Sequence, residues 1–186
     1  MQAKFDPCSP CINPQLIYMA TLIDLVESGT LDKIDPLEPG ELTWRTLYAT
    51  MDFLTWLEEG LPGLNHNELY SNLTPEEQVF SAFAEYVSGE ELSTDRRFKK
   101  LSWTPDHRIW EFKTDEVRVF GWVPQKNAFI CCFGDSADRI KATNSYGRYM
   151  AQTTYVRDNI DLDEPKYIDS GNYADVLSNA TGPKIP

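Results

Sequence analysis

The sequence predicts an α+β fold: a small antiparallel sheet, made of a three-strand meander plus a preceding strand, packed by helices and extended by an extra N-terminal helix. Two observations indicate this class. Three strand-like runs follow one another closely in the second half of the chain, and helical patterns with start signals lie before and after them. The turns between the three runs are too short for a parallel return, so neighbouring strands should pair antiparallel.

The composition of the 186-residue chain fits one domain, or one domain with an extension. Hydrophobic residues make up 41% and aromatic residues 12%, which is enough to bury a core and excludes a collagen-like, coiled-coil or wholly disordered chain. No apolar run approaches the roughly 18 residues of a membrane span. The first residues also lack the charged-then-apolar layout of a secretion signal. We therefore expect a soluble, cytoplasmic protein without a membrane partner.

Residues 1–42 are expected to form an N-terminal arm and a helical extension. Asn13 can cap a helix that Pro14 opens and that Gly29 ends. The apolar face of this helix holds Leu16, Met19, Ile23 and Val26. Prolines and a glycine interrupt residues 30–42, which we expect to be a linker or loop.

The expected core domain, residues 43–160, begins with a strand and two helices. Residues 44–48 are aromatic and β-branched, which favours a short strand. Asp52 can cap a helix that runs to Glu59. A stronger helix start lies at Thr74, where the sequence Thr-Pro-Glu-Glu combines a capping box with proline at the first helical position.

Three strands and a helix complete the domain. The strands are expected over residues 109–112, 117–123 and 128–133, and the last is a continuous apolar run typical of a buried central strand. A helix is expected over residues 145–160. Residues 161–186 are expected to form an acidic, irregular tail.

The net charge of −12 is unevenly spread along the chain. Residues 1–94 carry 3 basic and 16 acidic side chains, residues 95–157 carry 12 and 7, and residues 158–186 carry 2 and 6. The overall acidity argues against nonspecific nucleic-acid binding, while the basic middle leaves a local contact with RNA or phosphate open. A solvated acidic surface would explain the charge blocks equally well.

The four cysteines do not predict a metal centre. Cys8 and Cys11 have the spacing of a metal-binding or redox pair, but the chain has no second such pair. The two histidines and one member of the adjacent pair Cys131 and Cys132 would have to complete a zinc site. We expect free thiols instead, the first pair in the arm and the second buried in an apolar run, with no metal and no cofactor.

Four short segments in the basic middle carry a resemblance to a known family. They are a basic-leucine segment, an apolar strand with a glutamate, an arginine–valine strand and an apolar strand, at Arg97–Leu101, Ile109–Phe112, Val117–Trp122 and Ala128–Phe133. With these segments, residues 44–160 resemble the RelE/HigB-like toxins, particularly their phage-derived branch.

The resemblance implies a toxin of a toxin–antitoxin, phage or mobile-element system that acts as a metal-independent, mostly ribosome-dependent mRNA endoribonuclease. The implied partners are mRNA and the ribosome, and an antitoxin that wraps or caps the active face; the oligomeric state stays open. In this chemistry the 2′-hydroxyl attacks the adjacent phosphorus, so a base must take its proton. Cations stabilise the phosphorane and an acid protonates the leaving oxygen.

The resemblance implies catalytic roles for residues around the middle strand. Arg118 matches the family's strand arginine and would bind the scissile phosphate, and Lys113 matches a basic residue at the strand end. The alternatives are an ion pair of Arg118 with Glu111 or Asp115, and a solvated turn lysine. His107 is a candidate acid or base, because histidine ordinarily titrates near neutrality.

The candidates for RNA phosphate binding follow the third strand: Arg139, Lys141 and Arg148. Here the sequence departs from the family pattern, because Asp135 and Asp138 stand where cations belong and would repel an RNA backbone. This departure and the net charge favour a second function, a catalytically degenerate acidic binding module that acts through protein–protein contacts or nucleic-acid mimicry.

Overall fold

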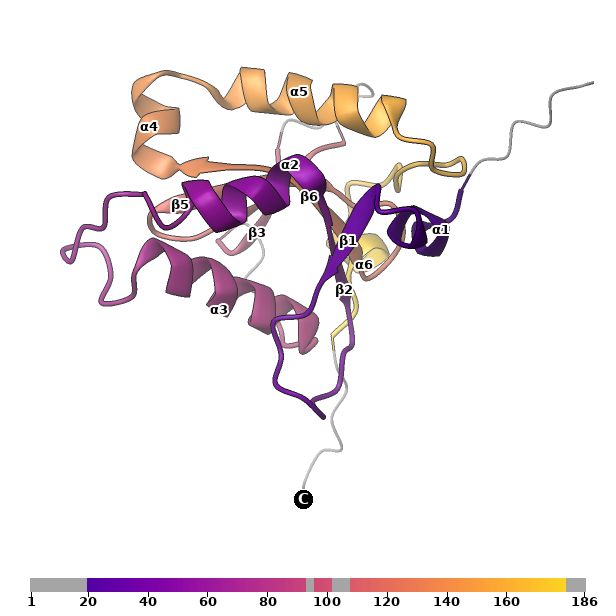
Figure 1. The fold of residues 1–186 in the computed structure, drawn as a ribbon, viewed down its shortest axis with the longest axis horizontal. Coiled ribbons are helices and arrows are strands. Elements are labelled where there is room, and N and C mark those ends of the chain that lie inside the picture. The colour runs from indigo at the N-terminus through magenta and orange to yellow at the C-terminus, as the bar shows by residue number, and fades with distance from the viewer. Residues whose placement is uncertain (1–19, 93–95, 102–107, 180–186) are drawn as a thin grey trace, which may run out of the picture.

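A computed structural model describes residues 20–92, 96–101 and 108–179 of the chain (Figure 1). In chain order the elements of these residues are α1 (Leu22–Glu27), β1 (Leu31–Ile34), β2 (Thr46–Thr50), α2 (Met51–Thr55), the π-helix η1 (Trp56–Gly60), α3 (Pro75–Val87), β3 (Phe98–Lys100), β4 (Trp110–Lys113), β5 (Val117–Trp122), β6 (Ala128–Ser136), α4 (Ala137–Ala142), α5 (Tyr146–Asn159) and α6 (Tyr173–Val176).

The strands form one mixed six-stranded sheet in the order β1-β2-β6-β5-β4-β3. β2 pairs with β6 in parallel, and every other neighbouring pair is antiparallel. The predicted α+β class is confirmed, but the small, wholly antiparallel sheet is wrong in size and in pairing. β2 can lie parallel to β6 because three helical segments and three strands separate them, which lets the chain return to the same end of the sheet.

Two strands lie where no strand was predicted. β1 falls in the segment that we expected to be a linker or loop, and the prolines that suggested a loop begin only after it, at Pro36. Leu31 and Ile34 are buried, so β1 adds to the core as well as to the sheet. β3 has only three residues, which is too short to show a period of two in the sequence.

Helices cover both faces of the sheet, and Figure 1 shows α3 and α5 on opposite sides of it. On one face α2, α3 and α6 pack on a core that includes Leu47, Phe53, Phe83, Phe112 and Phe129. On the other face α1, α4 and α5 pack on two smaller clusters that include Leu25, Trp122, Ile130, Phe120 and Tyr149. The side chains of β5 alternate between the two faces: Val117 and Val119 face the first core, and Phe120 and Trp122 face the smaller clusters.

The N-terminal helix is shorter at its start than the predicted helix 14–28. The Thr21 side chain accepts a hydrogen bond from the backbone of Asp24, whose carboxylate accepts from Thr21 in return. This capping box starts α1 directly after Thr21. Ala20 is not helical, since it forms a strand-like bridge with Leu162. Residues 14–19 of the prediction lie outside the described residues.

The two longest predicted helices are confirmed. α3 begins with the expected capping box, in which the Thr74 backbone N–H donates to the Glu77 carboxylate at 2.8 Å, and Pro75 occupies the first turn. α5 spans all but the end residues of the predicted helix 145–160. In α3 the capping chemistry and the apolar period agree, which is why sequence rules locate this helix well. α5 forms without a side-chain cap at Ser145.

Other segments are more structured than predicted. The predicted helix 52–59 divides into α2 and the π-helix η1. α4 was not predicted; its start is capped by Ser136. The predicted tail 161–186 is largely irregular over its described part, but it contains α6 and returns Val176 and Leu177 to the core.

Replacing Gly121 by alanine should destabilise the protein. A Cβ at Gly121 would lie 2.0 Å from the Ile130 backbone oxygen and 2.6 Å from the Phe129 ring, where β5 and β6 shift register. We expect Gly121→Ala to lower the free energy of unfolding by about 1–3 kcal/mol, measured by urea denaturation. Gly147→Ala on exposed α5 backbone, where a Cβ meets nothing within 4 Å, is the matched control and should stabilise by about 0.5–1 kcal/mol. Equal stability of the two variants would contradict the close β5–β6 contact.

Candidate active site

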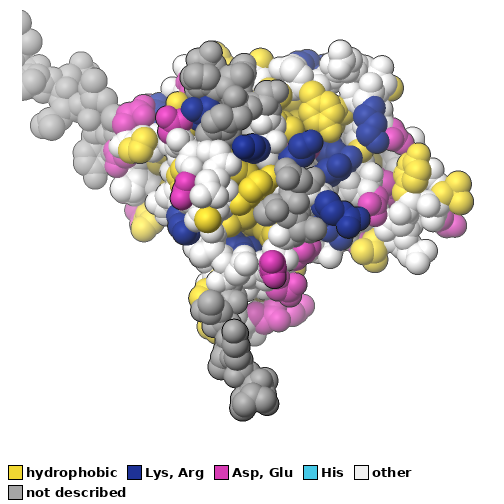
Figure 2. All heavy atoms as spheres, turned by 180° about the vertical axis from the view of Figure 1, so that it is seen from behind, with side chains coloured by type: hydrophobic (Ala, Val, Ile, Leu, Met, Phe, Trp, Pro, Cys, Tyr) yellow, Lys and Arg dark blue, Asp and Glu magenta, His cyan; other side chains and the backbone are white. Residues whose placement is uncertain are grey.

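A cavity of about 580 Å³ lies between strands β3, β4 and β5 and helices α4 and α5. Its lining is rich in cations: the lining residues are Lys99, Lys100, Leu101, Glu111, Lys113, Arg118, Lys141, Tyr146 and Met150. Figure 2 shows Lys and Arg side chains gathered across the middle of the face of the molecule seen from behind. We refer to this cavity as the basic pocket.

Strand register brings the central residues of the basic pocket together. Lys99 of β3 pairs with Glu111 of β4, and Lys113 of β4 pairs with Arg118 of β5. Directly paired residues project from the same face of a sheet, and so do residues two apart on one strand. All four side chains therefore share the face that α4 and α5 partly cover.

Arg118 is 4% exposed and is held by the turn that precedes its own strand. Its Nη1 donates to the carbonyl oxygen of Val117 at 2.7 Å and to that of Thr114. Its Nε has no hydrogen-bond partner among the described residues. Neither Glu111 nor Asp115 forms an ion pair with Arg118 in the described structure, so neither of the two ion pairs considered from the sequence is present.

Glu111 is the functional candidate that sequence reasoning missed. It is 2% exposed, and its Oε2 has no hydrogen-bond partner among the described residues. Burial raises the pKa of the carboxyl above its ordinary value, against the opposing attraction of Arg118, Lys99 and Lys113. A buried carboxylate with a raised pKa in a cleft is the arrangement expected of a general base. The signal in the sequence that could have indicated it is that Glu111 is the one acidic residue in an otherwise apolar strand segment, Ile109–Phe112.

The other predicted site residues divide between two places. Lys113 and Lys141 line the basic pocket. Arg139 and Arg148 line a separate cavity of about 340 Å³ beside η1, and neither lines the basic pocket. His107 lies outside the described residues.

Arg139 and Arg148 are engaged with their own neighbours rather than turned to the basic pocket. The Arg139 Nε donates to the buried carboxylate of Asp135 at 2.6 Å, and the Tyr149 hydroxyl donates to the same carboxylate at 2.5 Å. Arg148 lies over the Tyr149 ring and donates to its hydroxyl. Asp135, expected to repel RNA, is thus buried and paired, while the exposed Asp138 lies 3.8 Å from Lys141.

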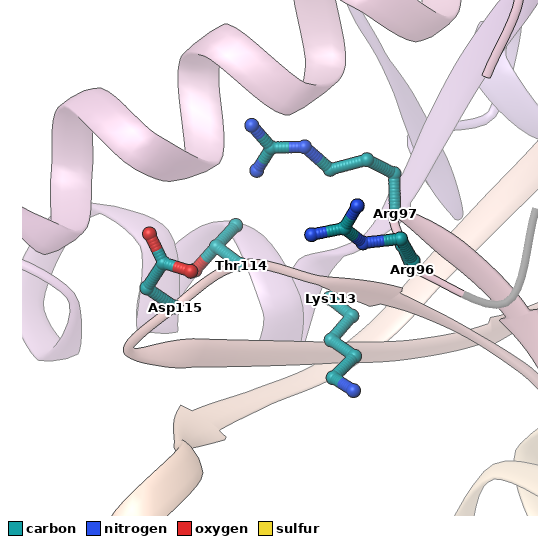
Figure 3. Close-up of a pocket in the computed structure, with 5 residues that line it drawn as sticks. All are labelled: Arg96, Arg97, Lys113, Thr114 and Asp115. Atoms are coloured by element: carbon teal, nitrogen blue, oxygen red, sulfur yellow. The ribbon is translucent and has the colours of Figure 1, made fainter. Parts of the chain in front are cut away.

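A second cavity of about 430 Å³ adjoins the start of β3 and the β4–β5 turn. Its lining residues are Arg96, Arg97, Lys113, Thr114 and Asp115. Figure 3 shows both guanidinium groups extending toward Thr114 and Asp115, while the Lys113 side chain points the other way across the hairpin. Lys113 thus lines this cavity, which we call the arginine cavity, as well as the basic pocket.

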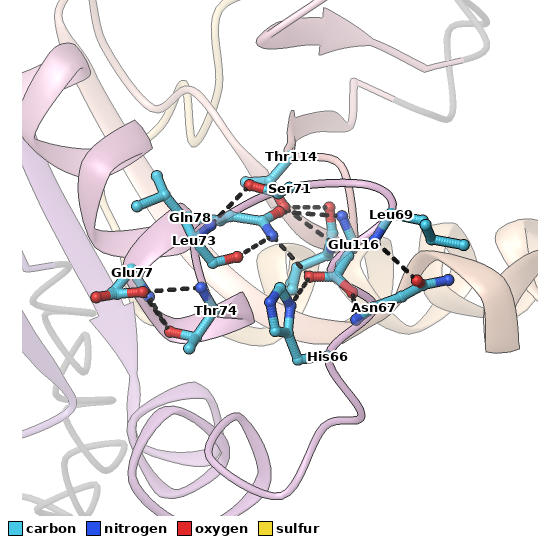
Figure 4. A network of polar contacts seen from close by, with 11 residues as sticks. His66, Asn67, Leu69, Ser71, Leu73, Thr74, Glu77, Gln78, Thr114 and Glu116 are labelled. Carbon is cyan, nitrogen blue, oxygen red and sulfur yellow. Dashed lines mark hydrogen bonds and ion pairs between the residues drawn. The ribbon is translucent and has the colours of Figure 1, made fainter.

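The carboxylate of Glu116, at the end of the β4–β5 turn, anchors this turn to neighbouring residues (Figure 4). This carboxylate accepts hydrogen bonds from the Asn67 backbone at 2.6 Å and from the Gln78 amide at 2.7 Å, and it lies 2.8 Å from Nδ1 of His66. Burial tends to raise the pKa of Glu116, but these contacts together hold it below its ordinary value. The network ties the turn that holds Arg118 to α3 and to the loop before it.

The described residues contain no group of three or more His, Cys, Asp or Glu side chains that could hold a metal ion. Cys131 and Cys132 are buried free thiols, as predicted. Burial raises the pKa of Cys132 to about 12, so its thiol stays protonated at neutral pH. Cys8 and Cys11 lie outside the described residues, and the expectation of free thiols there stays a prediction.

No protein-family model, no curated protein and no solved structure matches this chain. The resemblance to RelE/HigB-like toxins therefore stays a prediction that depends on the residues alone. Among the described residues, no helix has the length and apolar character needed to cross a membrane.

Replacing Glu111 by glutamine should stabilise the protein at neutral pH. A carboxyl whose pKa is raised on folding contributes stability below its unfolded-state pKa and loses it as the pH rises through the folded-state pKa. Glu111→Gln should therefore raise the midpoint of thermal unfolding at pH 7.5 by roughly 2–4 °C, or about 1 kcal/mol, and leave it unchanged near pH 3. The exposed control Glu58→Gln should change neither value. A Glu111→Gln variant that is less stable at pH 7.5 would identify Glu111 as a structural partner of the cations instead.

Proposed function

We propose that this protein is a metal-independent endoribonuclease with the basic pocket as its active site, and that it is a toxin of a toxin–antitoxin, phage or mobile-element system. The toxin assignment follows from the resemblance of residues 44–160 to RelE/HigB-like toxins. One observation supports RNA cleavage most strongly: the buried, unpartnered carboxylate oxygen of Glu111 lies in a pocket whose other charged lining residues are all cations.

In the proposed reaction Glu111 acts as the general base. Its carboxylate takes the proton of a ribose 2′-hydroxyl, whose oxygen forms a bond to the adjacent phosphorus. The bond from phosphorus to the 5′-oxygen breaks, and that oxygen receives a proton from the pocket. The products are a 2′,3′-cyclic phosphate and a 5′-hydroxyl, so atoms and charges balance without a metal or an oxidant.

The cations of the basic pocket supply the other two roles. Arg118 has a guanidinium Nε without a partner in the described structure, and a guanidinium suits the fork-like recognition of phosphate oxygens. Lys99 and Lys113 project from the same face and would stabilise the charge that develops on the phosphorane. The ammonium groups and the Tyr146 hydroxyl are the proton donors that line the pocket.

A binding module without catalysis is the second candidate function, because one loop presents apolar side chains to solvent. Leu69 is 91% exposed and Tyr70 is 54% exposed, in a loop that the Glu116 network holds in place. Exposed apolar groups on a fixed loop are typical of protein–protein contacts. In this case the net charge of −12 would act on a basic partner protein.

Induced expression in bacteria should separate the two functions. We expect growth arrest and new mRNA 5′ ends with the natural sequence. Glu111→Gln and Arg118→Ala should each abolish both, because loss of a general base or of a phosphate ligand costs on the order of a hundredfold or more in rate. Lys33→Ala, an exposed lysine on edge strand β1, is the control and should behave as the natural sequence.

Soluble, folded protein at equal levels must accompany each variant in this experiment. Normal growth and intact mRNA with soluble natural protein would refute the endoribonuclease and favour the binding module. Growth arrest that persists in Glu111→Gln would refute the general-base role of Glu111. The role of the basic pocket would then be judged from Arg118→Ala alone.

A further inference from the structure

The arginine cavity contains two arginines that the proposed reaction does not use. A single scissile phosphate bound by Arg118 would leave Arg96 and Arg97 without a role. Arg96 makes no ion pair with any described residue. Arg97 has only a long contact, with its Nε 3.7 Å from the Glu85 carboxylate. Both guanidinium groups therefore keep donors available to a ligand.

The arginine cavity and the basic pocket meet at Lys113, which lines both, and we call the two cavities together the strip. The Lys113 backbone N–H donates to the Arg97 carbonyl at 2.8 Å, and Lys113 is also the cross-strand partner of Arg118. Arg97 and Arg118 thus flank Lys113 on its two sides. Two strand spacings of about 4.8 Å separate their backbones by roughly 10 Å, more than one phosphate group can bridge.

We propose that the arginine cavity binds a second backbone phosphate of the same nucleic-acid strand, next to the phosphate held by Arg118. The inference depends on the proposed function, since it assumes that the basic pocket receives a phosphodiester. The substrate is then single-stranded RNA that carries at least two phosphates across the strip, and a mononucleotide or a dinucleotide with one phosphate cannot fill it.

The negative charge of Asp115 on the cavity wall allows a second test, in which binding should become stronger instead of weaker. Asp115 is exposed and lines the arginine cavity, where its carboxylate opposes a bound phosphate. Removing this charge should strengthen the binding of a long strand, whereas removing the two arginines should weaken it.

The test is equilibrium binding of two 2′-deoxy probes, which cannot be cleaved because they lack the attacking hydroxyl. One probe is a dinucleotide with a single phosphodiester, and the other is a single-stranded hexanucleotide. For the full chain with Arg96→Ala and Arg97→Ala together, we expect about tenfold weaker binding of the hexanucleotide and unchanged binding of the dinucleotide. The slope of log affinity against log salt should become shallower by about 0.7 for the hexanucleotide, because the contact with one phosphate is lost.

Two matched controls accompany this experiment. Lys33→Ala with Lys126→Ala removes the same charge on edge strand β1 and on the β5–β6 turn, and should leave both affinities unchanged apart from a small uniform shift. Asp115→Asn should strengthen hexanucleotide binding by about two- to fivefold, and Asp161→Asn, an exposed aspartate that lines neither cavity, should not.

Three outcomes would overturn the inference. Equal weakening of both probes would mean that the arginines act through the fold or the general field, and unchanged hexanucleotide binding would mean that they bind no phosphate. Natural protein that binds both probes alike also refutes it. RNA that is not cleaved, with the length-dependent binding intact, would instead refute the proposed reaction and leave the second phosphate site standing.

Discussion

The pairing of β5 with β4 and β6 is the constraint on which the rest of the structure depends. All six residues of β5 are buried, because helices cover both faces of the sheet. The strand period therefore decides which side chains enter the apolar core and which enter the basic pocket. A slip of one residue would send Arg118 into the core of Phe83 and Phe112, so the register is strongly specified. The Glu116 network adds to this by fixing the turn from which β5 starts.

The basic pocket holds two buried charged side chains whose polar atoms are incompletely paired. A buried carboxylate with an unpartnered oxygen and a buried guanidinium with an unpartnered Nε are each unfavourable in a folded chain. Elsewhere two buried carboxylates are well paired, since Asp135 accepts from Arg139 and Tyr149 and Glu116 has three partners. The buried Arg157 also has one Nη atom without a partner among the described residues. Proteins retain such unpaired groups where a ligand completes them, which is why the pocket rather than the Asp135 cluster carries the functional argument.

Local rules predicted the parts of the fold in which several signals agree. α3 has a capping box, a proline and an apolar period, and the run before Phe133 is continuously apolar; both segments form as predicted. Local rules did not predict β1 or the parallel pairing of β2 with β6, because both depend on contacts between residues far apart in the sequence. The candidate site was predicted only in part, because it also depends on contacts between residues far apart in the sequence. Arg118 and Lys113 lie in segments that can be recognised as strands from the sequence. Glu111 becomes a candidate only in the structure, where it is buried and its Oε2 has no hydrogen-bond partner among the described residues.

The acidity of the whole chain and the basicity of the pocket act over different distances. At physiological ionic strength charges are screened beyond about 8 Å, so the net charge of −12 has little effect on a strand already seated in the pocket. During the approach the same charge repels a polyanion and lowers the rate of nonspecific encounters. A strand then gains binding energy only where several of its phosphates meet the strip from Lys141 to Arg96 at once. Under the proposed function, weak encounters combined with a short cationic strip would favour a flexible single strand over a rigid duplex.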